Sequence, residues 1–330
     1  MVLLLSADDV RQVLDFPSAI EAVAEAHMAH ARGKVVMPVR LSMAWDERPS
    51  EMEAMPAYLG GPPGHDAFGV KLITYVGTNT ARGIPAIHAV IVLFDPDDGR
   101  PIAIMDGRYS TAVRTAAASA LATRLLAREG ARVLAIAGAG VQGRTHLEAI
   151  LAVRPLEAVR VVDSDRSRAE EMVREATAAH PSMSVTVEDS VRQAVQQADV
   201  IVTSTTSASP ILEWDWIAPG THVNAIGSHS PGVRELATEV VTRSRIVVDS
   251  REAALKEAGD FLIPIREGAL TADAVGTELG QVAAGLRPGR KERDEVTLYK
   301  SCGIALQDVA VARLVYERAR DRGIGHAVEI

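Results

Sequence analysis

The chain has a single cysteine, Cys302, and aromatic side chains make up only 4% of its residues. One cysteine excludes a disulfide within the chain and a zinc site built from several thiolates, and it is typical of proteins from reducing compartments. We therefore expect a cytoplasmic protein without a metal site. Because aromatic side chains are scarce, Ala, Val, Leu and Ile must pack the core, and a hydrophobic content of 47% is sufficient for that.

Long apolar runs and blocks of basic residues are also missing. No apolar run approaches the roughly 18 residues that a membrane helix needs. The opening segment Met1 to Leu5 is shorter than the apolar core of a signal peptide and has no basic flank. The formal net charge is −8, with no basic cluster that would bind a phosphate backbone. We expect a soluble protein that binds neither membranes nor nucleic acid.

A glycine-rich turn follows one short apolar run. The run, Val133 to Ala137, is typical of a buried strand, and Gly138, Gly140 and Gly143 follow it with the spacing G-x-G-x-x-G. A helix is predicted next, from Gln142 to Ala152. Strand, turn and helix in this order form a dinucleotide-binding turn, in which helix N–H groups face the pyrophosphate. We expect contacts to a dinucleotide from Gly138, Gly140, Val141, Gln142 and Gly143.

Asp163 ends a second apolar run, Val159 to Val162, and stands 25 residues after Gly138. The acid that binds the adenine ribose is expected at an offset of about 20 residues. A carboxylate there accepts hydrogen bonds from the ribose hydroxyls and repels a 2′-phosphate, so NAD is favoured over NADP. Arg166 and Arg168 lie just beyond it and could reach such a phosphate, which keeps NADP possible.

The pattern as a whole predicts an α/β protein with two domains. From about residue 132 to 260, apolar strands alternate with helices, as in a Rossmann doubly wound parallel sheet. Between residues 33 and 100, short strands are separated by glycine and proline turns, as in a mostly antiparallel sheet. An amphipathic helix from Gly303 to Arg320 is expected to return to the first domain. We predict a mixed α/β substrate and dimerisation domain (1–125 with 306–330) and a Rossmann dinucleotide-binding domain (126–305).

Three cations occupy positions where a charge needs a partner. Lys71 interrupts the strand-like segment 68–75, so its ammonium must reach water at a sheet edge or face a polar site. Arg114 is the one cation of a helix whose residues 110–122 are small and apolar on nearly every face. A buried guanidinium there needs a carboxylate, either from the protein or from a substrate. Arg40 is expected on a strand, where an ordinary surface arginine is the alternative.

Three further side chains are candidates for the same site. Glu53 could pair with any of the three cations. His88 interrupts an apolar run from Ile84 to Phe94, where a structural core histidine is the more common interpretation. His229 lies just beyond the predicted strand 222–226, at the edge where doubly wound sheets bind ligands. An imidazole there can exchange a proton near neutral pH, and a loop histidine without a catalytic role is the alternative.

In this order of parts the sequence resembles the ornithine cyclodeaminase/mu-crystallin family. The resemblance covers nearly the whole chain, and the motifs are specific together although each is short. They are, in order, Pro38-Val-Arg40, Glu53-Ala-Met-Pro56, Lys71, Arg114-Thr-Ala-Ala-Ala-Ser119, the glycine turn, Asn224-Ala-Ile-Gly227 and Tyr299-Lys-Ser301.

The resemblance implies a role for each candidate residue. Arg40, Lys71 and Arg114 would hold a substrate carboxylate. Glu53 would orient Lys71, and His88 would line the site. The dinucleotide would be contacted by Thr115, the glycine turn, Asp163, Ser204, Thr205 and Ser301. A homodimer joined through the N-terminal domain is implied as well.

One departure from the family bears on the reaction. Cyclodeaminases and alanine dehydrogenases of the family carry an aspartate in the N-A-[IV]-G-x-D loop, where it handles the substrate amine. Here that position is His229. An imidazole pairs poorly with the second ammonium of ornithine, which disfavours cyclodeamination. Asp215 and Asp260 could replace the aspartate only if the fold brings them to the site.

We therefore expect an NAD(P)-dependent oxidoreductase that reduces 2-imino acids, such as the cyclic ketimine Δ1-pyrroline-2-carboxylate, to L-amino acids. Cations would fix the carboxylate, the nicotinamide would deliver hydride to the adjacent carbon, and His229 or Lys71 would supply a proton to nitrogen. The alternatives are an ornithine or lysine cyclodeaminase that releases ammonia, an alanine-type dehydrogenase, and a non-catalytic binding protein like mu-crystallin. In each case the partner is a small imino or amino acid with a carboxylate.

Overall fold

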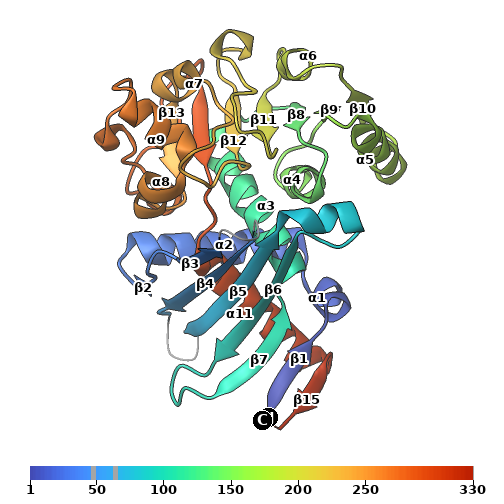
Figure 1. Ribbon diagram of the computed structural model, residues 1–330, viewed down its shortest axis with the longest axis vertical. Coiled ribbons are helices and arrows are strands. Elements are labelled where there is room, and N and C mark those ends of the chain that lie inside the picture. Colours follow the sequence, from blue (N-terminus) through green and yellow to red (C-terminus); the bar gives the residue numbers. More distant parts are fainter. Residues whose placement is uncertain (46–49, 62–65, 330) are drawn as a thin grey trace. The chain divides into compact units, whose positions relative to one another are not determined.

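The computed structural model describes residues 1–45, 50–61 and 66–329. The chain forms two compact units, which Figure 1 shows with their elements labelled. Unit 1 consists of Met1–Thr115 and Gly303–Ile330, and unit 2 consists of Ala116–Cys302. Helix α3 (Gly107–Leu126) begins in unit 1 and ends in unit 2, so the division falls at residue 115, inside this helix, and not at residue 125.

Unit 1 is built on a mostly antiparallel sheet, as predicted. Its described strands follow the order β15-β1-β7-β6-β5-β4-β2, and β3 pairs with β4. Neighbouring strands are antiparallel except β1 and β7, which run parallel. The strands are β1 (Val2–Leu5), β2 (Val35–Val36), β3 (Leu41–Trp45), β4 (Ser50–Leu59), β5 (Ala67–Val76), β6 (Ile87–Phe94), β7 (Pro101–Asp106) and β15 (His326–Val328).

Two long helices cover this sheet. Helix α2 (Phe16–Ala31) packs against α11 (Ala305–Arg322), and α11 also contacts strands β4, β5 and β6 (Figure 1). The short helix α1 (Ala7–Val13) begins with a reciprocal cap, in which Ser6 and Asp9 each bond the backbone N–H of the other. A short 3₁₀ helix, η1 (Gly77–Arg82), follows β5. The C-terminal helix therefore completes the N-terminal unit.

Side-chain alternation gives the unit 1 sheet a buried face and an exposed face. Met55, Lys71 and Ile91 are cross-strand partners, and all three are buried on the face that α11 covers. Residues one step along each strand point to the opposite face. Large apolar side chains there are exposed: Val36, Leu41, Met43, Trp45, Phe68 and Val90.

Unit 2 contains the predicted Rossmann sheet. All its neighbouring strands are parallel, in the order β10-β9-β8-β11-β12-β14-β13. The order reverses at β8, which lies between β9 and β11, and ligands bind such sheets at the carboxyl ends of these strands. The strands are β8 (Val133–Ala137), β9 (Ala158–Val162), β10 (Ser184–Val187), β11 (Val200–Thr203), β12 (His222–Ala225), β13 (Arg245–Val248) and β14 (Thr297–Lys300).

The core of unit 2 is made of small and branched apolar residues, as the composition predicts. Alternate strand residues such as Leu134, Ile136 and Val200 pack with Leu147 and Met172 of the adjoining helices. Within the described ranges, no helix combines the length and the apolar character needed to cross a membrane. The helices are α4 (Val141–Leu151), α5 (Arg166–Ala179), α6 (Val191–Val195), α7 (Thr238–Arg243), α8 (Arg251–Glu257), α9 (Gly259–Arg266), α10 (Leu279–Ala283) and the 3₁₀ turns η2 (Trp214–Trp216) and η3 (Ala272–Ala274).

Candidate active site and dinucleotide turn

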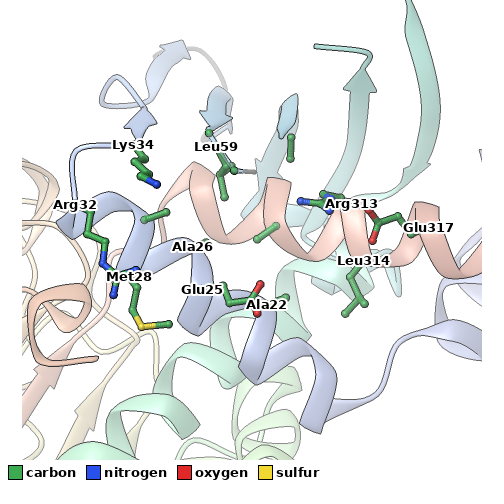
Figure 2. A pocket seen from close by; sticks show the side chains of 15 residues that line it. Ala22, Glu25, Ala26, Met28, Arg32, Lys34, Leu59, Arg313, Leu314 and Glu317 are labelled. Atoms are coloured by element: carbon green, nitrogen blue, oxygen red, sulfur yellow. Dashed lines mark hydrogen bonds and ion pairs between the residues drawn. The ribbon is translucent and has the colours of Figure 1, made fainter. Parts of the chain in front are cut away.

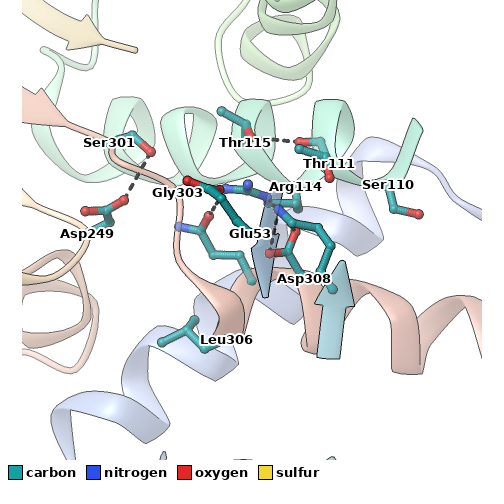
Figure 3. A network of polar contacts seen from close by, with 12 residues as sticks. Glu53, Ser110, Thr111, Arg114, Thr115, Asp249, Ser301, Gly303, Leu306 and Asp308 are labelled. Atoms are coloured by element: carbon teal, nitrogen blue, oxygen red, sulfur yellow. Dashed lines mark hydrogen bonds and ion pairs between the residues drawn. The ribbon is translucent and has the colours of Figure 1, made fainter. Parts of the chain in front are cut away.

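Lys71 lies in the interior strand β5 and points to the buried face, so a lysine exposed at a sheet edge is ruled out. Its Nζ lies 2.9 Å from Asp308 Oδ2 and donates a hydrogen bond to Oδ1 at 3.1 Å. Asp308 Oδ1 also accepts a hydrogen bond from Arg114 Nε at 2.9 Å (Figure 3). Lys71 and Asp308 have almost no exposed surface. One buried carboxylate of α11 therefore holds two of the three predicted cations.

Arg40 joins this cluster from the segment before β3. It is not on a strand as predicted, since β3 begins at the next residue, Leu41. Arg40 Nη1 donates to Glu53 Oε2 at 2.9 Å, and Nη2 donates to the carbonyl oxygen of Gly303 at 2.6 Å. Both side chains of this ion pair are largely buried, so the alternative of an ordinary surface arginine is wrong.

Glu53 and Lys71 lie on the same face of the neighbouring strands β4 and β5. The structure pairs them with different partners, because Glu53 bonds Arg40 and the ion pair of Lys71 is with Asp308. The expectation that Glu53 orients Lys71 is thereby corrected. Asp308 takes that role because α11 lies directly over the strand that carries Lys71.

The ion pairs of this cluster contain more cations than carboxylates. Arg40, Lys71 and Arg114 pair with the two carboxylates Glu53 and Asp308. Glu51, on the same face of β4, interacts electrostatically with Arg40 and Glu53, and burial raises its pKa. Burial lowers the pKa of Lys71 to about 8; Arg114 and Arg40 act in the same direction, and Asp308 opposes them. A site of this kind attracts a small anion, and its lysine can exchange a proton close to neutral pH.

Arg114 is 5% exposed and forms the buried ion pair that was one of its two predicted alternatives. Besides its bond to Asp308, it donates from Nη1 to Gln307 Oε1 at 2.7 Å. Gly303 lies against the guanidinium: its φ is +76°, and a Cβ there would be 2.5 Å from Arg114 Nη1. Within the part of the chain that the structure describes, Arg114 Nη2 has no protein partner.

Thr115 lies next to Arg114 on α3, whereas His88 lies on the other face of the unit 1 sheet. Thr115 follows Arg114 on α3, is 6% exposed and donates its hydroxyl to the carbonyl oxygen of Thr111 at 2.7 Å. His88 lies on β6, three residues from Ile91, the cross-strand partner of Lys71. Because strand side chains alternate, His88 points to the opposite face of the sheet, where it is exposed. It is therefore not a core histidine, and the structure does not bring it to the cation cluster.

The glycine turn of unit 2 has the geometry that its spacing predicts. Gly138 has a φ of +105°, and a Cβ there would lie 2.6 Å from the carbonyl oxygen of Ser204. A Cβ on Gly143 would lie 2.0 Å from the carbonyl oxygen of Gly138, so α4 packs directly on the turn. A Cβ on Gly140 would meet no atom within 4 Å, so this side of the turn is open to a ligand.

Helix α4 begins at this open side. Gly140 is its N-cap and supplies no side-chain hydrogen bond to the first N–H groups. The next residue, Val141, is 69% exposed, and Gln142 Oε1 is buried without a hydrogen-bond partner among the described residues. Uncapped N–H groups at a helix N-terminus bind phosphate. These residues fit the pyrophosphate of a dinucleotide.

Asp163 follows β9 and braces the glycine turn. Its Oδ2 accepts a hydrogen bond from Ala139 N at 2.7 Å, and its Oδ1 accepts one from Asp165 N at 2.8 Å. Each carboxylate oxygen can accept two hydrogen bonds, so capacity is left for ribose hydroxyls. The residue thus combines a structural role with the chemistry expected of a ribose-binding acid.

The two arginines beyond Asp163 are engaged by neighbouring carboxylates. Arg166 lies 3.0 Å from Glu170 and 2.5 Å from Asp189, and Arg168 lies 3.4 Å from Asp165. These pairs are exposed and individually weak, but they reduce the positive charge that a 2′-phosphate would meet. This arrangement favours NAD over NADP.

Glu235 fixes the loops that follow β11 and β12. Its Oε1 accepts hydrogen bonds from the N–H and the hydroxyl of Thr205, both at 2.7 Å. Its Oε2 accepts from Gly227 N at 2.8 Å and Thr203 Oγ1 at 2.9 Å. The adjacent Ser204 donates its hydroxyl to the glycine turn, at 3.2 Å from a carbonyl oxygen. A single buried carboxylate therefore holds the sheet edge where Ser204 and Thr205 lie.

Asp260 forms a second buried ion pair, with Lys300. It lies 2.9 Å from Lys300 Nζ, and its Oδ1 accepts from the backbone N–H groups of Glu235 and Leu236. Neither Asp260 nor Lys300 has exposed surface, so Asp260 does not stand in for the missing family aspartate. Asp215 is exposed in η2.

Ser301 and His229 complete the predicted set. Ser301 follows β14, is buried, and donates its hydroxyl to Asp249 Oδ2 at 3.3 Å (Figure 3). His229 lies in the loop after β12 and is exposed. That loop is closed by a hydrogen bond of 2.6 Å from Ser228 Oγ to the carbonyl oxygen of Val233.

A separate groove of about 660 Å³ lies in unit 1 beside α2 and α11 (Figure 2). Small apolar side chains form most of its lining, and Glu25, Arg32, Lys34, Arg313 and Glu317 supply the charges. None of the predicted substrate or cofactor residues lines it, so the groove is not part of the candidate site.

Three functional side chains were missed from the sequence: Gln307, Asp308 and Glu235. The first two are polar residues of the predicted amphipathic helix 303–320, and the signal available in the sequence was their spacing of three and four residues from Ile304 and Val311 of its apolar face. Glu235 lies outside regular secondary structure, and no local pattern distinguishes it from a surface glutamate.

Comparison with known proteins extends the motif resemblance to the whole chain. The sequence model of the Ornithine cyclodeaminase/mu-crystallin family matches residues 2–323. The Delta(1)-pyrroline-2-carboxylate reductase of Bacillus cereus is 35% identical over 329 residues, which cover 99% of this chain and 100% of the relative.

Two solved structures share the fold. That of the Thermococcus litoralis Delta(1)-pyrroline-2-carboxylate reductase in complex with NADH and L-proline has a TM-score of 0.95 and 36% identity, covering 99% of this chain and 100% of its own. That of an archaeal alanine dehydrogenase dimer with bound NAD has a TM-score of 0.93 and 33% identity, covering 100% and 99%. Sequence, fold and motifs agree over the full length, and the chain belongs to the ornithine cyclodeaminase/mu-crystallin family.

Proposed function

We propose that the protein is an NAD(P)-dependent reductase of 2-imino acids, with cyclic ketimines such as Δ1-pyrroline-2-carboxylate as substrates and L-amino acids as products. The observation that carries the proposal is the buried cluster of Arg40, Lys71 and Arg114, in which three cations pair with only two carboxylates, Glu53 and Asp308. The Bacillus relative that is named for this reaction, and the Thermococcus structure with NADH and L-proline, support it.

The cofactor proposed for this chain is NAD, held by the glycine turn. The open side of Gly140 and the uncapped start of α4 fit the pyrophosphate, and Asp163 fits the adenine ribose. Thr115, Ser204, Thr205 and Ser301 are proposed as its further contacts. When bound, the reduced cofactor supplies the hydride.

The cation cluster would bind the substrate carboxylate and orient the adjacent C=N bond. Arg114 offers Nη2, while Arg40 and Lys71 add positive charge around the same anion. Fixing the carboxylate next to the reacting carbon turns hydride addition into a reaction between prepositioned groups. As hydride adds to the carbon, the π electrons of C=N move to nitrogen, which binds a proton.

His229 or Lys71 would supply that proton. An imidazole changes its charge between about pH 5 and 8, and the pKa of Lys71 is lowered to about 8, so either group can act as a general acid near neutral pH. The histidine also explains why we favour imine reduction over cyclodeamination, since it offers no fixed negative charge to a second ammonium.

We further propose that two copies of the chain form a homodimer through the exposed face of the unit 1 sheet. Six large apolar side chains of β2, β3, β5 and β6 are exposed on that one face, among them Met43, Phe68 and Val90. A contiguous apolar surface of this kind marks a protein interface. The archaeal alanine dehydrogenase structure, described as a dimer, supports the proposal.

The test of the proposed reaction is NADH oxidation after addition of Δ1-pyrroline-2-carboxylate at neutral pH, with NADPH in parallel. Rapid oxidation of NADH is the expected result. A preference for NADPH would overturn the argument from Asp163 and leave the reaction class standing. No oxidation of either cofactor would contradict the proposal. Ammonia release from ornithine with catalytic NAD, and NADH formation from L-alanine, then test the two alternatives.

A further inference from the structure

We propose that Gln307 is a positioning residue that sets the orientation of the Arg114 guanidinium, and that His27 fixes the amide of Gln307. The inference rests on the proposed function, because that function makes a substrate carboxylate the ligand of Arg114. Gln307 and His27 do not themselves touch the substrate in this proposal. They act through the arginine.

Gln307 lies between Arg114 and His27. Its Oε1 accepts a hydrogen bond from Arg114 Nη1 at 2.7 Å, and its Nε2 lies 3.0 Å from His27 Nε2. Gln307 and His27 have no exposed surface. A buried amide has to satisfy its polar atoms with the partners that surround it, so both contacts constrain its orientation.

Only one arrangement of hydrogen atoms suits this chain of contacts. Arg114 has donors only, so the amide oxygen of Gln307 must face it and the amide NH₂ must face His27. His27 Nε2 must then accept, which requires a neutral ring with its hydrogen on Nδ1. Burial lowers the pKa of His27 to about 3, with His30 acting in the same direction, so the ring is neutral at physiological pH. A reversed amide would place NH₂ groups against the guanidinium.

The consequence is a guanidinium held on three sides. Asp308 accepts from Nε, Gln307 accepts from Nη1, and the backbone of Gly303 lies against the group so closely that a Cβ would be 2.9 Å from Nη2. Gly303 lies in front of the edge between Nη1 and Nη2, so Nη2, which has no partner among the described residues, is left to contact a carboxylate from its other side. Without Gln307, the guanidinium would keep its charge but lose one of the contacts that direct this edge.

A residue with this role affects carboxylate binding more than cofactor binding. The experiment therefore uses pyrrole-2-carboxylate, a planar analogue that is not reduced, titrated calorimetrically into the protein saturated with NAD⁺. In Gln307→Met the dissociation constant should rise by a factor on the order of ten, because a charge-assisted hydrogen bond is lost. The dissociation constant for NADH, followed by fluorescence, should change by less than about twofold.

His27→Leu removes the acceptor that holds the amide of Gln307 and leaves the cation cluster itself intact. It should weaken binding of the analogue in the same direction but less than Gln307→Met. The double variant should bind it no more weakly than Gln307→Met alone, because both changes act on one element. His27→Leu also carries the test if Gln307→Met does not fold.

Val311→Ala is the matched control, since Val311 is buried on the same helix and its side chain is apolar. It should lower stability and leave the affinity for the analogue unchanged. Two results would overturn the inference and leave the proposed function standing. One is an unaltered affinity for the analogue in both Gln307→Met and His27→Leu. The other is a loss of affinity for NADH as large as the loss of affinity for the analogue. A wild-type protein that neither binds the analogue nor reduces the imino acid would overturn the proposed function and the inference with it.

Discussion

Lys71 and Asp308 are 237 positions apart in the chain, yet the ammonium and the carboxylate lie 2.9 Å apart without exposed surface. The same carboxylate accepts a hydrogen bond from Arg114. Removing one partner of a buried ion pair leaves an uncompensated charge, which is strongly destabilising. The fold of unit 1 and the proposed carboxylate site therefore depend on one side chain.

Asp308→Asn should lower the free energy of unfolding by about 3 to 5 kcal/mol, because two buried cations lose their shared counter-charge. Urea denaturation measures the change. Asp8→Asn is the matched control, because Asp8 also forms an ion pair with an arginine, Arg11, but its side chain is 86% exposed. The free energy of unfolding of this control variant should fall by less than about 1 kcal/mol. Equal losses in the two variants would contradict the role assigned to Asp308.

Carboxylate binding should weaken as the pH rises through about 8, the pKa of Lys71, because the cluster loses the positive charge of Lys71 there. The affinity for pyrrole-2-carboxylate, whose carboxylate stays ionised over this range, measures the effect directly. Lys71→Arg should abolish this pH dependence, since a guanidinium stays protonated. A pH dependence that persists in Lys71→Arg would assign it to another group.

Stability should change with pH in the opposite direction. The pKa of Lys71 is lowered from 10.5 in the unfolded chain to about 8 in the folded protein. Between these values the unfolded state binds more protons, so the contribution of Lys71 to stability increases with pH. Chemical denaturation at pH 7.5 and 9.5, compared with Lys71→Arg, isolates this contribution.

The sequence predicted those features that depend on neighbouring residues. The glycine turn was recognisable because Gly138, Gly140 and Gly143 serve backbone geometry at fixed spacing, and the structure shows close approaches at Gly138 and Gly143 and an open side at Gly140. The parallel and antiparallel sheets followed from the alternation of strands, helices and turns. Arg40 was wrongly placed on a strand because a local pattern does not determine the exact residue at which a strand begins, here Leu41.

Long-range partners could not be predicted in the same way. Periodicity identifies the apolar face of the last helix, but it does not say that Gln307 and Asp308 meet Arg114 and Lys71. The face of the sheet to which His88 points depends on strand register, which the sequence of one strand does not contain. Burial and pairing in three dimensions, and not local pattern, select these residues.

Asp163→Ser should lower the preference for NADH over NADPH by a factor on the order of ten or more, because repulsion of a 2′-phosphate and the contacts to the ribose are both removed. The ratio of kcat/KM for the two cofactors measures it. Asp273→Ser, at an exposed carboxylate of unit 2 that pairs with Arg251, serves as the control and should leave the ratio unchanged. An unchanged ratio in Asp163→Ser would remove this residue from cofactor selection.

Phe68→Glu should shift the proposed dimer toward monomers. A carboxylate on the apolar face of the unit 1 sheet would have to be buried without a partner in the interface. Light scattering coupled to size exclusion, at several protein concentrations, gives the mass. Leu286→Glu is the control, since Leu286 is 61% exposed and belongs to unit 2, not to this sheet. A dimer that survives Phe68→Glu unchanged would place the interface elsewhere.

His229→Ala decides which group donates the proton to nitrogen. If the imidazole is the general acid, kcat should fall by a factor of about 10² to 10⁴, and the decrease of kcat with rising pH near neutrality should disappear. Binding of pyrrole-2-carboxylate should change little, because the cation cluster does not include His229. His180→Ala, at a partly exposed histidine of unit 2 that pairs with Glu148, controls for general effects of losing an imidazole. If kcat falls but its pH profile keeps the wild-type shape, His229 orients the substrate and Lys71, with its pKa of about 8, becomes the proton donor.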